Sequence, residues 1–211
     1  MYIPEKMKMT DVTTMQQFIE EFSFGIIVSN TDKNKLNATH LPFTLNKEDG
    51  EFGSLTCHFA RVNPHWRQLN EQELLVIFNG PHSFISSKWY AKQPNVPTWN
   101  YAAVHCQVKA EVLPDAETDV AMQKTLTMFE PSLLNKTEHS FQHYQAKLMK
   151  AIVFVKLTIT GIEGKLKLGQ HRNNADQQSV TNALASESTY DAMHLLSYMN
   201  KIQCGLGSND T

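Results

Sequence analysis

Cysteine is scarce in this sequence. Three cysteines, Cys57, Cys106 and Cys204, occur among 211 residues. They are too few and too scattered for a disulfide framework, and none lies in a CxxC pair that could bind zinc. The sequence therefore argues against a disulfide scaffold and predicts a protein of the reducing cytoplasm.

Long apolar runs and an excess of one charge are missing too. No segment approaches the ~18 consecutive apolar residues of a membrane span, and the N-terminal MYIPEKMKMTD has no apolar core after its charges. The formal net charge is only −2, unlike that of a chain built to bind phosphate backbones or anionic membranes. We therefore expect neither secretion nor membrane insertion, and the charge weakens any nucleic-acid hypothesis.

The common catalytic motifs are absent as well. The chain has no GxSxG elbow, P-loop or GxGxxG turn, so acyl transfer and the common nucleotide folds have no positive support. The helical pair His139 and His143 lacks the glutamate of a zinc-protease motif. No carboxylate or cysteine stands at ligand spacing from the histidines on or beside predicted strands, which are His40, His58, His82 and His105. We expect no metal site.

The hydrophobic pattern predicts one helix followed by many strands. Apolar residues recur at helical spacing from Asp11 to Phe22. Segments rich in β-branched and aromatic residues then predict strands at 24–30, 36–46, 53–59, 73–80, 100–113 and 152–169. Further helices are predicted after Asn63, at 116–130 and 138–150, and as a pair within 176–201, where Ser188 and Asp191 suggest a capping box. The pattern is typical of an α+β barrel with helices at its ends.

The sharpest local feature is the strand-to-helix junction RVNPHW. Asn63 can cap a short helix, and Pro64 takes the first helical position. Backbone amides at a helix start attract anions, and Arg61 could clamp a phosphate. The junction, with His65 and Trp66, is therefore a candidate phosphate site; a capped surface helix with a solvated arginine is the alternative.

The stretch 81–99 is irregular and contains three prolines, which predicts a functional loop. Aromatic side chains in or beside it could stack on a planar ring, and the neighbouring polar groups suit a polar heteroaromatic ligand. Core packing is the alternative. The residues concerned are Ser86, Ser87, Trp89, Tyr90, Thr98, Trp99, Asn100 and Tyr101.

Six blocks stand out in order along the chain. They are MYIP at the start, NATHLPF (37–43), HFARVNPHW (58–66), FNGPHSFISSKWY (78–90), VPTWNYAAVH (96–105) and KLGQHRNNADQQSV (167–180). Together they resemble the PaiB-like family of FMN-binding negative transcriptional regulators. The resemblance spans nearly the whole chain. The chain departs from the family pattern in Ser-Lys at 87–88, where members often have Ser-Pro, and in Gly-Gln-His-Arg at 169–172, where they often have Ser-Gln-Asn-Arg.

The resemblance implies a split β-barrel related to pyridoxamine phosphate oxidases, with FMN as the cofactor. Members of the family are usually homodimers with flavin sites at the subunit interface, so the resemblance implies the same assembly here. By position, Arg61, Asn63 and His65 resemble the phosphate-holding turn of such proteins, and the strand with His40 resembles the one beside the isoalloxazine ring.

Four more residues are implied by the same resemblance. Asn100 and His105 lie on what resembles the next flavin-contacting strand, and Gln170 and Arg172 look like a polar pair that reaches into the site. We therefore predict a split β-barrel of the FMN-binding type with peripheral helices. It is expected to form a single domain over 1–211, with a C-terminal helical extension at about 174–211.

Three functions remain open on the sequence. The first is a flavin-responsive negative regulator, although the stretch from Ser188 to Asn200 has no arginine or lysine for DNA contact. The second is a flavin-dependent oxidoreductase in which the cofactor performs the electron transfer, so that no catalytic residue can be named. The third is a binding module that has lost its cofactor and keeps only the dimer.

Overall fold

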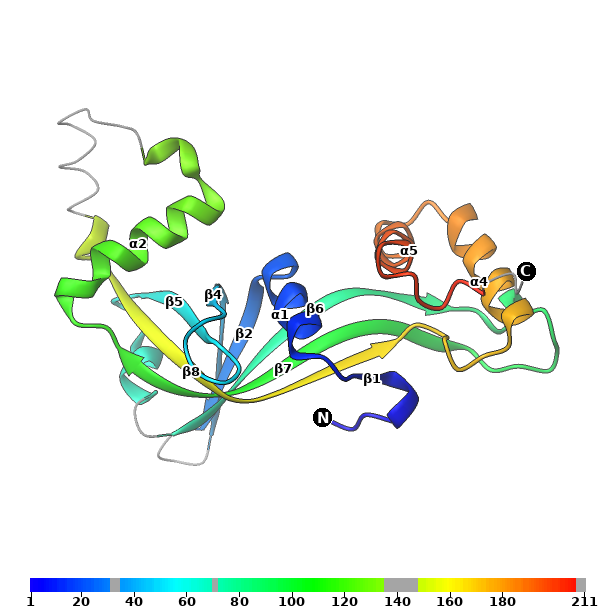
Figure 1. The fold of residues 1–211 in the computed structure, drawn as a ribbon, viewed down its shortest axis with the longest axis horizontal. Helices are drawn as coiled ribbons and strands as arrows, with labels where there is room; N and C mark the ends of the chain where they lie inside the picture. Colours follow the sequence, from blue (N-terminus) through cyan, green and yellow to red (C-terminus); the bar gives the residue numbers. More distant parts are fainter. Residues whose placement is uncertain (31–34, 70–71, 135–147, 208–211) are drawn as a thin grey trace. The chain divides into compact units, whose positions relative to one another are not determined.

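The computed structural model describes residues 1–30, 35–69, 72–134 and 148–207 and shows the predicted α+β class (Figure 1). The strands are β1 (Lys8–Met9), β2 (Phe24–Asn30), β3 (Leu36–Pro42), β4 (Thr44–Asn46), β5 (Ser54–Ala60), β6 (Glu73–Ile85), β7 (Thr98–Val112) and β8 (Ile152–Lys167). The α-helices are α1 (Val12–Glu21), α2 (Asp115–Phe129), α4 (Asn174–Ser186) and α5 (Tyr190–Ile202). The 3-10 helices are η1 (Glu5–Met7), η2 (Pro64–Gln68), η3 (Ser87–Trp89) and η4 (Pro131–Leu133). Most of the helix predicted at 138–150, with His139 and His143, lies outside the described residues.

The described strands form one sheet in the order β3-β2-β6-β7-β8-β5-β4. β8 is long enough to pair with two antiparallel strands in succession. β5 pairs along Ile152 to Thr158, and β1 pairs at Gly164 and Lys165. At the other end of the order β3 pairs with β2, and β3 also lies close to β5, so the sheet curls back on itself.

The predicted helix at 11–22 is confirmed as α1. Met15, Phe18 and Ile19 are buried at the spacing of one helix face. α2 and the C-terminal helices α4 and α5 are also confirmed. No helix among the described residues is both long enough and apolar enough to cross a bilayer.

Three local predictions were wrong. The stretch 36–46 is not one strand, because the backbone N–H of Phe43 turns away to donate to the Ser23 carbonyl, which separates β3 from β4. The stretch 81–99 is not irregular throughout, because β6 continues to Ile85 and β7 begins at Thr98. α5 has no capping box: its N-cap is Thr189, which makes no side-chain capping bond.

The described chain gathers into two compact units. Unit 1 comprises 1–11, 79–104 and 163–211, and unit 2 comprises 12–78 and 105–162. Both units contain parts of β6, β7 and β8. The single domain expected from the sequence stays a prediction.

In unit 2 many of the fully buried side chains come from the strands. They include Ile27, Leu55, Phe59, Phe78 and Val155. In unit 1 the helices α4 and α5 lie over one face of the strand ends (Figure 1). Leu184 and Leu195 are fully buried on these helices, as is Ile85 on β6. Unit 1 thus buries one face of its sheet under helices.

Candidate functional site

The turn at Asn63 forms as the sequence predicts. The Asn63 side chain accepts a hydrogen bond from the His65 backbone N–H at 3.0 Å, and Pro64 opens η2. The asparagine amide also donates to the Thr39 hydroxyl at 3.4 Å. The cap therefore ties the turn to β3 as well as to its own helix.

His65 is fully buried, and its ring joins this turn to two strands. Its Nε2 lies 2.8 Å from the Ser29 hydroxyl on β2, and its Nδ1 lies 2.7 Å from the Thr39 hydroxyl on β3. The Phe59 ring packs edge-on against it. Burial lowers the pKa of His65 below its usual value, because the charged imidazole loses hydration. The imidazole is therefore a neutral link that holds the turn in position, and its predicted contact with a cofactor stays a prediction.

The Arg61 guanidinium lies at the protein surface. Its Nε donates to the Lys150 carbonyl at 2.8 Å, and its Nη2 donates to the Ile152 carbonyl at 2.9 Å. A guanidinium carries five N–H groups, so these two bonds fix its position and leave donors for an anion. The donor set fits the phosphate that the sequence predicts.

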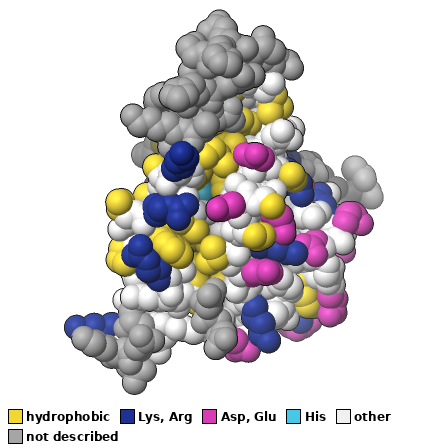
Figure 2. Space-filling view, turned by 90° about the vertical axis from the view of Figure 1, so that its left-hand side faces the viewer, with side chains coloured by type: hydrophobic (Ala, Val, Ile, Leu, Met, Phe, Trp, Pro, Cys, Tyr) yellow, Lys and Arg dark blue, Asp and Glu magenta, His cyan; other side chains and the backbone are white. Residues whose placement is uncertain are grey.

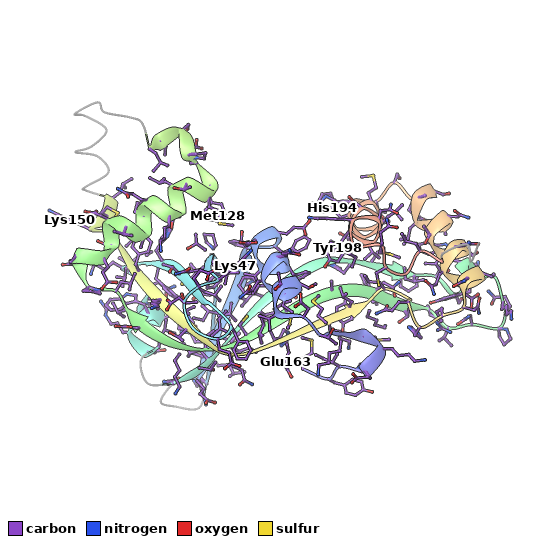
Figure 3. The ribbon with its side chains drawn as sticks, viewed as in Figure 1. Lys47, Met128, Lys150, Glu163, His194 and Tyr198 are labelled. Carbon is purple, nitrogen blue, oxygen red and sulfur yellow. The ribbon has the colours of Figure 1, made fainter. Side chains whose placement is uncertain are left out.

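A hollow of about 560 Å³ opens beside Arg61. Trp66 and Lys150 line it together with Asp115 and Asp119 of α2; Lys150 is labelled in Figure 3. Figure 2 shows the face at the left-hand end of Figure 1, where Lys and Arg gather on the left, and Asp and Glu with some further Lys and Arg lie on the right. Within the hollow, Arg61 and Lys150 favour an anion, whereas Asp115 and Asp119 oppose one.

His40 and His105 complete the predicted residues of unit 2. His40 is exposed on the edge strand β3, where it lies opposite Ile26, and its ring stacks on Phe24 at 6.3 Å. His105 is half-buried on β7. Unit 2 thus contains six predicted residues, His40, Arg61, Asn63, His65, Trp66 and His105.

The other six lie in unit 1, and several belong to a loop that is fixed to α4. Ser86 caps η3 by accepting from the Lys88 backbone N–H at 3.3 Å. Further along, the Lys92 N–H donates to the buried carboxylate of Asp176 at 3.1 Å. Asp176 also accepts from the Asn173 side chain at 2.8 Å. This carboxylate therefore anchors the loop that carries Ser86 and Trp89.

Gln170 and Arg172 do not act as a pair in this structure. The Gln170 side chain accepts from the Leu168 N–H and donates to the Lys6 and Leu166 carbonyls. The Arg172 guanidinium instead lies over the Tyr90 ring, 5.0 Å from its centroid. Gln170 therefore braces the C-terminal end of β8, and the contact of either residue with a cofactor stays a prediction.

The predicted aromatic cluster is divided. Tyr90 is buried beneath Arg172, whereas Trp99 is 50% exposed on the open face of the sheet beside His82 and Phe84. Asn100, the next residue along β7, is buried. A hollow of about 370 Å³ borders Trp99.

A larger hollow, of about 630 Å³, lies between α2 and the strands β4, β5 and β8. Its polar wall includes the ion pair of Asp49 with Lys156 at 2.7 Å. This hydrogen-bonded lysine lowers the pKa of the Asp49 carboxyl. Met128, labelled in Figure 3, belongs to its apolar wall. None of the predicted residues lines it.

The thiols and histidines form no metal centre among the residues described. Cys57 and Cys106 are buried, and burial raises the pKa of Cys106 to about 12 and that of Cys57 further still. A thiol with a raised pKa is a poor nucleophile and a poor metal ligand. Both cysteines therefore serve as core residues.

Comparison with known proteins now assigns the family. Residues 1–161 match the family described as "Putative FMN-binding domain". The chain belongs to this family. Over 205 residues it is 37% identical to the protease synthase and sporulation protein PAI 2 of Bacillus subtilis, a match that covers 94% of this chain and 96% of that protein. The resemblance identified from the sequence blocks is thereby confirmed, and FMN is the cofactor of the family.

Solved structures support the split-barrel fold. The FAD and heme binding protein of Mycobacterium smegmatis matches with a TM-score of 0.56 and 15% identity, over 77% of this chain and 74% of that one. The flavocytochrome Anf3 of Azotobacter vinelandii matches with a TM-score of 0.57 and 13% identity, over 77% of this chain and 70% of that one. At these identities the likeness concerns the fold alone.

Sequence reasoning missed residues whose partners are distant in the chain. Asp176 holds a loop residue 84 positions away, and Ser29 reaches His65 across 36 positions. Nothing in the sequence near Ser29 or Asp176 signals these contacts.

Proposed function

We propose that this protein binds FMN and acts, as a cytoplasmic homodimer, as a negative regulator of transcription of the PaiB type. The proposal is carried by the match of residues 1–161 to the FMN-binding family together with 37% identity to PAI 2 over nearly the full length of both chains. The name of that relative links it to protease synthesis and sporulation, which suits a protein that controls gene expression. Three free cysteines, two of them buried, suit a reducing compartment.

Residues of unit 2 would hold the phosphate of FMN. Arg61 offers guanidinium donors to the phosphate, and the capped turn at Asn63 fixes the backbone next to it. When bound, FMN supplies an electron-accepting ring, and the protein orients it and tunes its electronics.

The flavin-dependent oxidoreductase considered from the sequence is not favoured by the comparisons. DNA contact through α5 also lacks support, because its single lysine or arginine is Lys201 in the last turn. A regulatory dimer would then contact DNA through another surface, or act through a protein partner.

The first test is an FMN titration of the purified protein followed by flavin fluorescence, with riboflavin as the ligand that lacks the phosphate. We expect Arg61→Ala to weaken FMN binding by roughly 1.5–3 kcal/mol, the scale of a lost charged hydrogen bond, and to leave riboflavin binding unchanged. Arg67→Ala is the matched control, since Arg67 lies over the Trp66 ring of the same turn. Equal FMN affinity in wild type and a folded Arg61→Ala protein would refute the phosphate contact.

Regulation is tested separately, by retention of DNA from the upstream region of the protein's own gene, with and without FMN. We expect sequence-selective retention that weakens as salt is raised, because phosphate contacts release counterions. Sedimentation of the same samples should show a dimer. Retention that does not distinguish this DNA from an unrelated fragment would remove the support for direct operator binding.

A further inference from the structure

The sheet of unit 1 has one face under α4 and α5 and one open face. Along β6, Ser83 and Ile85 are buried. His82 and Phe84, which alternate with them, are exposed on the other face. The open face of an antiparallel sheet is ordinarily polar. Here it is aromatic, because the half-exposed Trp99 of β7 lies beside His82 at 5.9 Å and beside Phe84 at 6.2 Å between ring centroids.

Lysine side chains continue this face across the neighbouring strands β8 and β1. The Lys165 ammonium lies over the Tyr101 ring of β7, 5.3 Å from its centroid. Lys167, two residues further along β8, lies on the same face, and its ammonium donates to the Trp99 carbonyl at 2.7 Å. Lys8 of β1 is paired directly with Lys165 in the antiparallel register, so their side chains share a face. Aromatic rings and ammonium groups are therefore neighbours on one face of the sheet.

Further cations gather around the end of β8. Lys6 precedes β1, and His171 and Arg172 follow β8. Partial burial lowers the pKa of His171, and the positive charges of Arg172 and Lys167 lower it further. Lys6 acts on His171 in the same sense. These groups are therefore close enough to repel one another, and an anion among them would relieve the repulsion. The basic cluster of unit 1 comprises Lys6, Lys8, Lys165, Lys167, His171 and Arg172.

No member of the basic cluster forms an ion pair with a carboxylate within the described part of the chain. Glu163 of β8, labelled in Figure 3, is paired instead with the N-terminal ammonium at 2.7 Å. Glu5 of η1 offsets part of the charge of its neighbour Lys6. The formal net charge of −2 argues against nucleic-acid binding by the chain as a whole, but it does not describe this face, where the cations outnumber the carboxylates.

Exposed aromatic faces beside cations match the chemistry of a single-stranded nucleic acid. Unpaired bases stack on aromatic side chains, while lysine and arginine contact the phosphates next to them. The bases of a duplex are stacked on each other and present only their edges in the grooves, so a duplex would leave the Trp99 and Phe84 rings without a partner. Neighbouring strands lie ~4.8 Å apart, so the lysines of β8 and β1 stand one and two strands away from Trp99. A base on Trp99 would thus have its phosphate near the basic cluster.

We infer that the open face of unit 1, formed by Phe84 and Trp99 with the basic cluster beside them, binds single-stranded nucleic acid. This inference rests on the regulatory part of the proposed function. It deepens that function by naming the surface and the class of nucleic acid that is contacted. Lys6, Lys8 and Phe84 thereby become binding residues, which the sequence did not single out.

The test follows binding of fluorescently labelled oligonucleotides to the full chain by anisotropy, over a range of salt concentrations. The ligands are a mixed-sequence single strand of about 12 nucleotides, within the range of single-strand site sizes, and the duplex of the same sequence. Trp99→Ala removes the stacking ring, Trp99→Phe keeps an aromatic face, and a Lys6→Gln, Lys8→Gln protein removes two exposed charges. Tyr190→Ala, an exposed ring on α5, and Lys109→Gln, an exposed lysine on the part of β7 in unit 2, are the matched controls. Sedimentation velocity of each sample records its assembly state.

We expect wild type to bind the single strand more tightly than the duplex. Trp99→Ala should weaken the single strand roughly tenfold, the scale of one lost stacked base, and should keep the salt dependence. Trp99→Phe should recover most of the affinity. The Lys6→Gln, Lys8→Gln protein should bind more weakly at low salt, and the slope of log affinity against log salt should fall by about 1.4, because each lost single-strand phosphate contact removes about 0.7. Both control variants should match wild type.

Several outcomes would overturn the inference. If wild type prefers the duplex, the stacking surface is wrong while DNA binding, and with it the proposed function, stands. If Trp99→Ala binds the single strand as tightly as wild type, or if wild type binds neither oligonucleotide, the inference also fails, and the FMN titration decides separately whether the cofactor is bound. If Trp99→Ala loses the single strand only together with a change from dimer to monomer, the face is an interface between two copies, and the inference is again overturned.

Discussion

At the scale of single residues, His65 shows how a residue expected to contact a ligand can instead hold the scaffold. Its two ring nitrogens contact hydroxyls on neighbouring strands, and its own backbone N–H completes the Asn63 cap. A neutral imidazole can donate from one nitrogen and accept at the other, whereas the charged form must donate from both. The two hydroxyls, Ser29 and Thr39, can adapt by rotation, but the lost hydration of a buried cation cannot be recovered.

This contact predicts a pH dependence of stability. Burial lowers the pKa of His65 in the folded protein, whereas an unfolded histidine titrates near ~6.5. Below that value the unfolded chain binds a proton that the folded protein refuses, so the free energy of unfolding falls as pH falls. Burial lowers the pKa of His58 in the same sense.

The measurement is urea unfolding from pH 7.5 down to 5. We expect wild type to lose stability on acidification, and His65→Gln, whose amide can still donate and accept, to show a shallower slope. His194→Gln, an exposed histidine on α5, is the control and should keep the wild-type slope. A His65→Gln protein with the full wild-type slope would show that other groups cause the acid sensitivity.

At the scale of elements, the segment that follows α5 packs with its backbone close to the backbone at the end of β8. Gly205 is buried, with a φ of +76°, and a Cβ there would lie 2.3 Å from the Leu168 carbonyl oxygen at the end of β8. Gly50, in the turn between β4 and β5, has a φ of +89° with open space around it. The two positions share the left-handed backbone and differ in room.

Substitutions at Gly50 and Gly205 separate the cost of backbone strain from the cost of a steric clash. We expect Gly50→Ala to cost about 1 kcal/mol, because an L-residue is strained at positive φ. Gly205→Ala should cost about 3 kcal/mol or more, since the backbone must also move away from Leu168. Urea unfolding of both variants measures the difference. Equal costs would mean that the C-terminal segment shifts freely.

The elements also show what the sequence could predict. The two-residue period of strands was enough to predict β2 and the core of β5, and helical spacing was enough to predict α1. Each of these patterns can be read from neighbouring residues alone, because it repeats every two to four residues. The division between β3 and β4 escaped prediction, since it depends on a backbone bond from Phe43 to Ser23 across 20 positions. The candidate site followed the same rule: the Asn63 cap is local and was predicted, whereas the Asp176 anchor is distant and was not.

At the scale of the whole molecule, the two units are not separated by a linker. Three strands, β6, β7 and β8, begin in one unit and end in the other. Because these strands are common to both units, the unfolding of either unit alone would interrupt strands that the other unit also contains. We therefore expect the chain to unfold as one cooperative body, as the single domain predicted from the sequence would.

The three tryptophans allow this to be measured. Trp66 lies in unit 2, and Trp89 and Trp99 lie in unit 1. A Trp89→Phe, Trp99→Phe protein reports on unit 2, and a Trp66→Phe, Trp89→Phe protein reports on unit 1 through Trp99. In urea each reporter should give the same midpoint and slope as the far-ultraviolet circular dichroism of its own sample, since coincident probes indicate a two-state transition. If Trp99 instead reports an earlier transition while the backbone signal of unit 2 persists, the two units unfold separately and the prediction of one cooperative body is wrong.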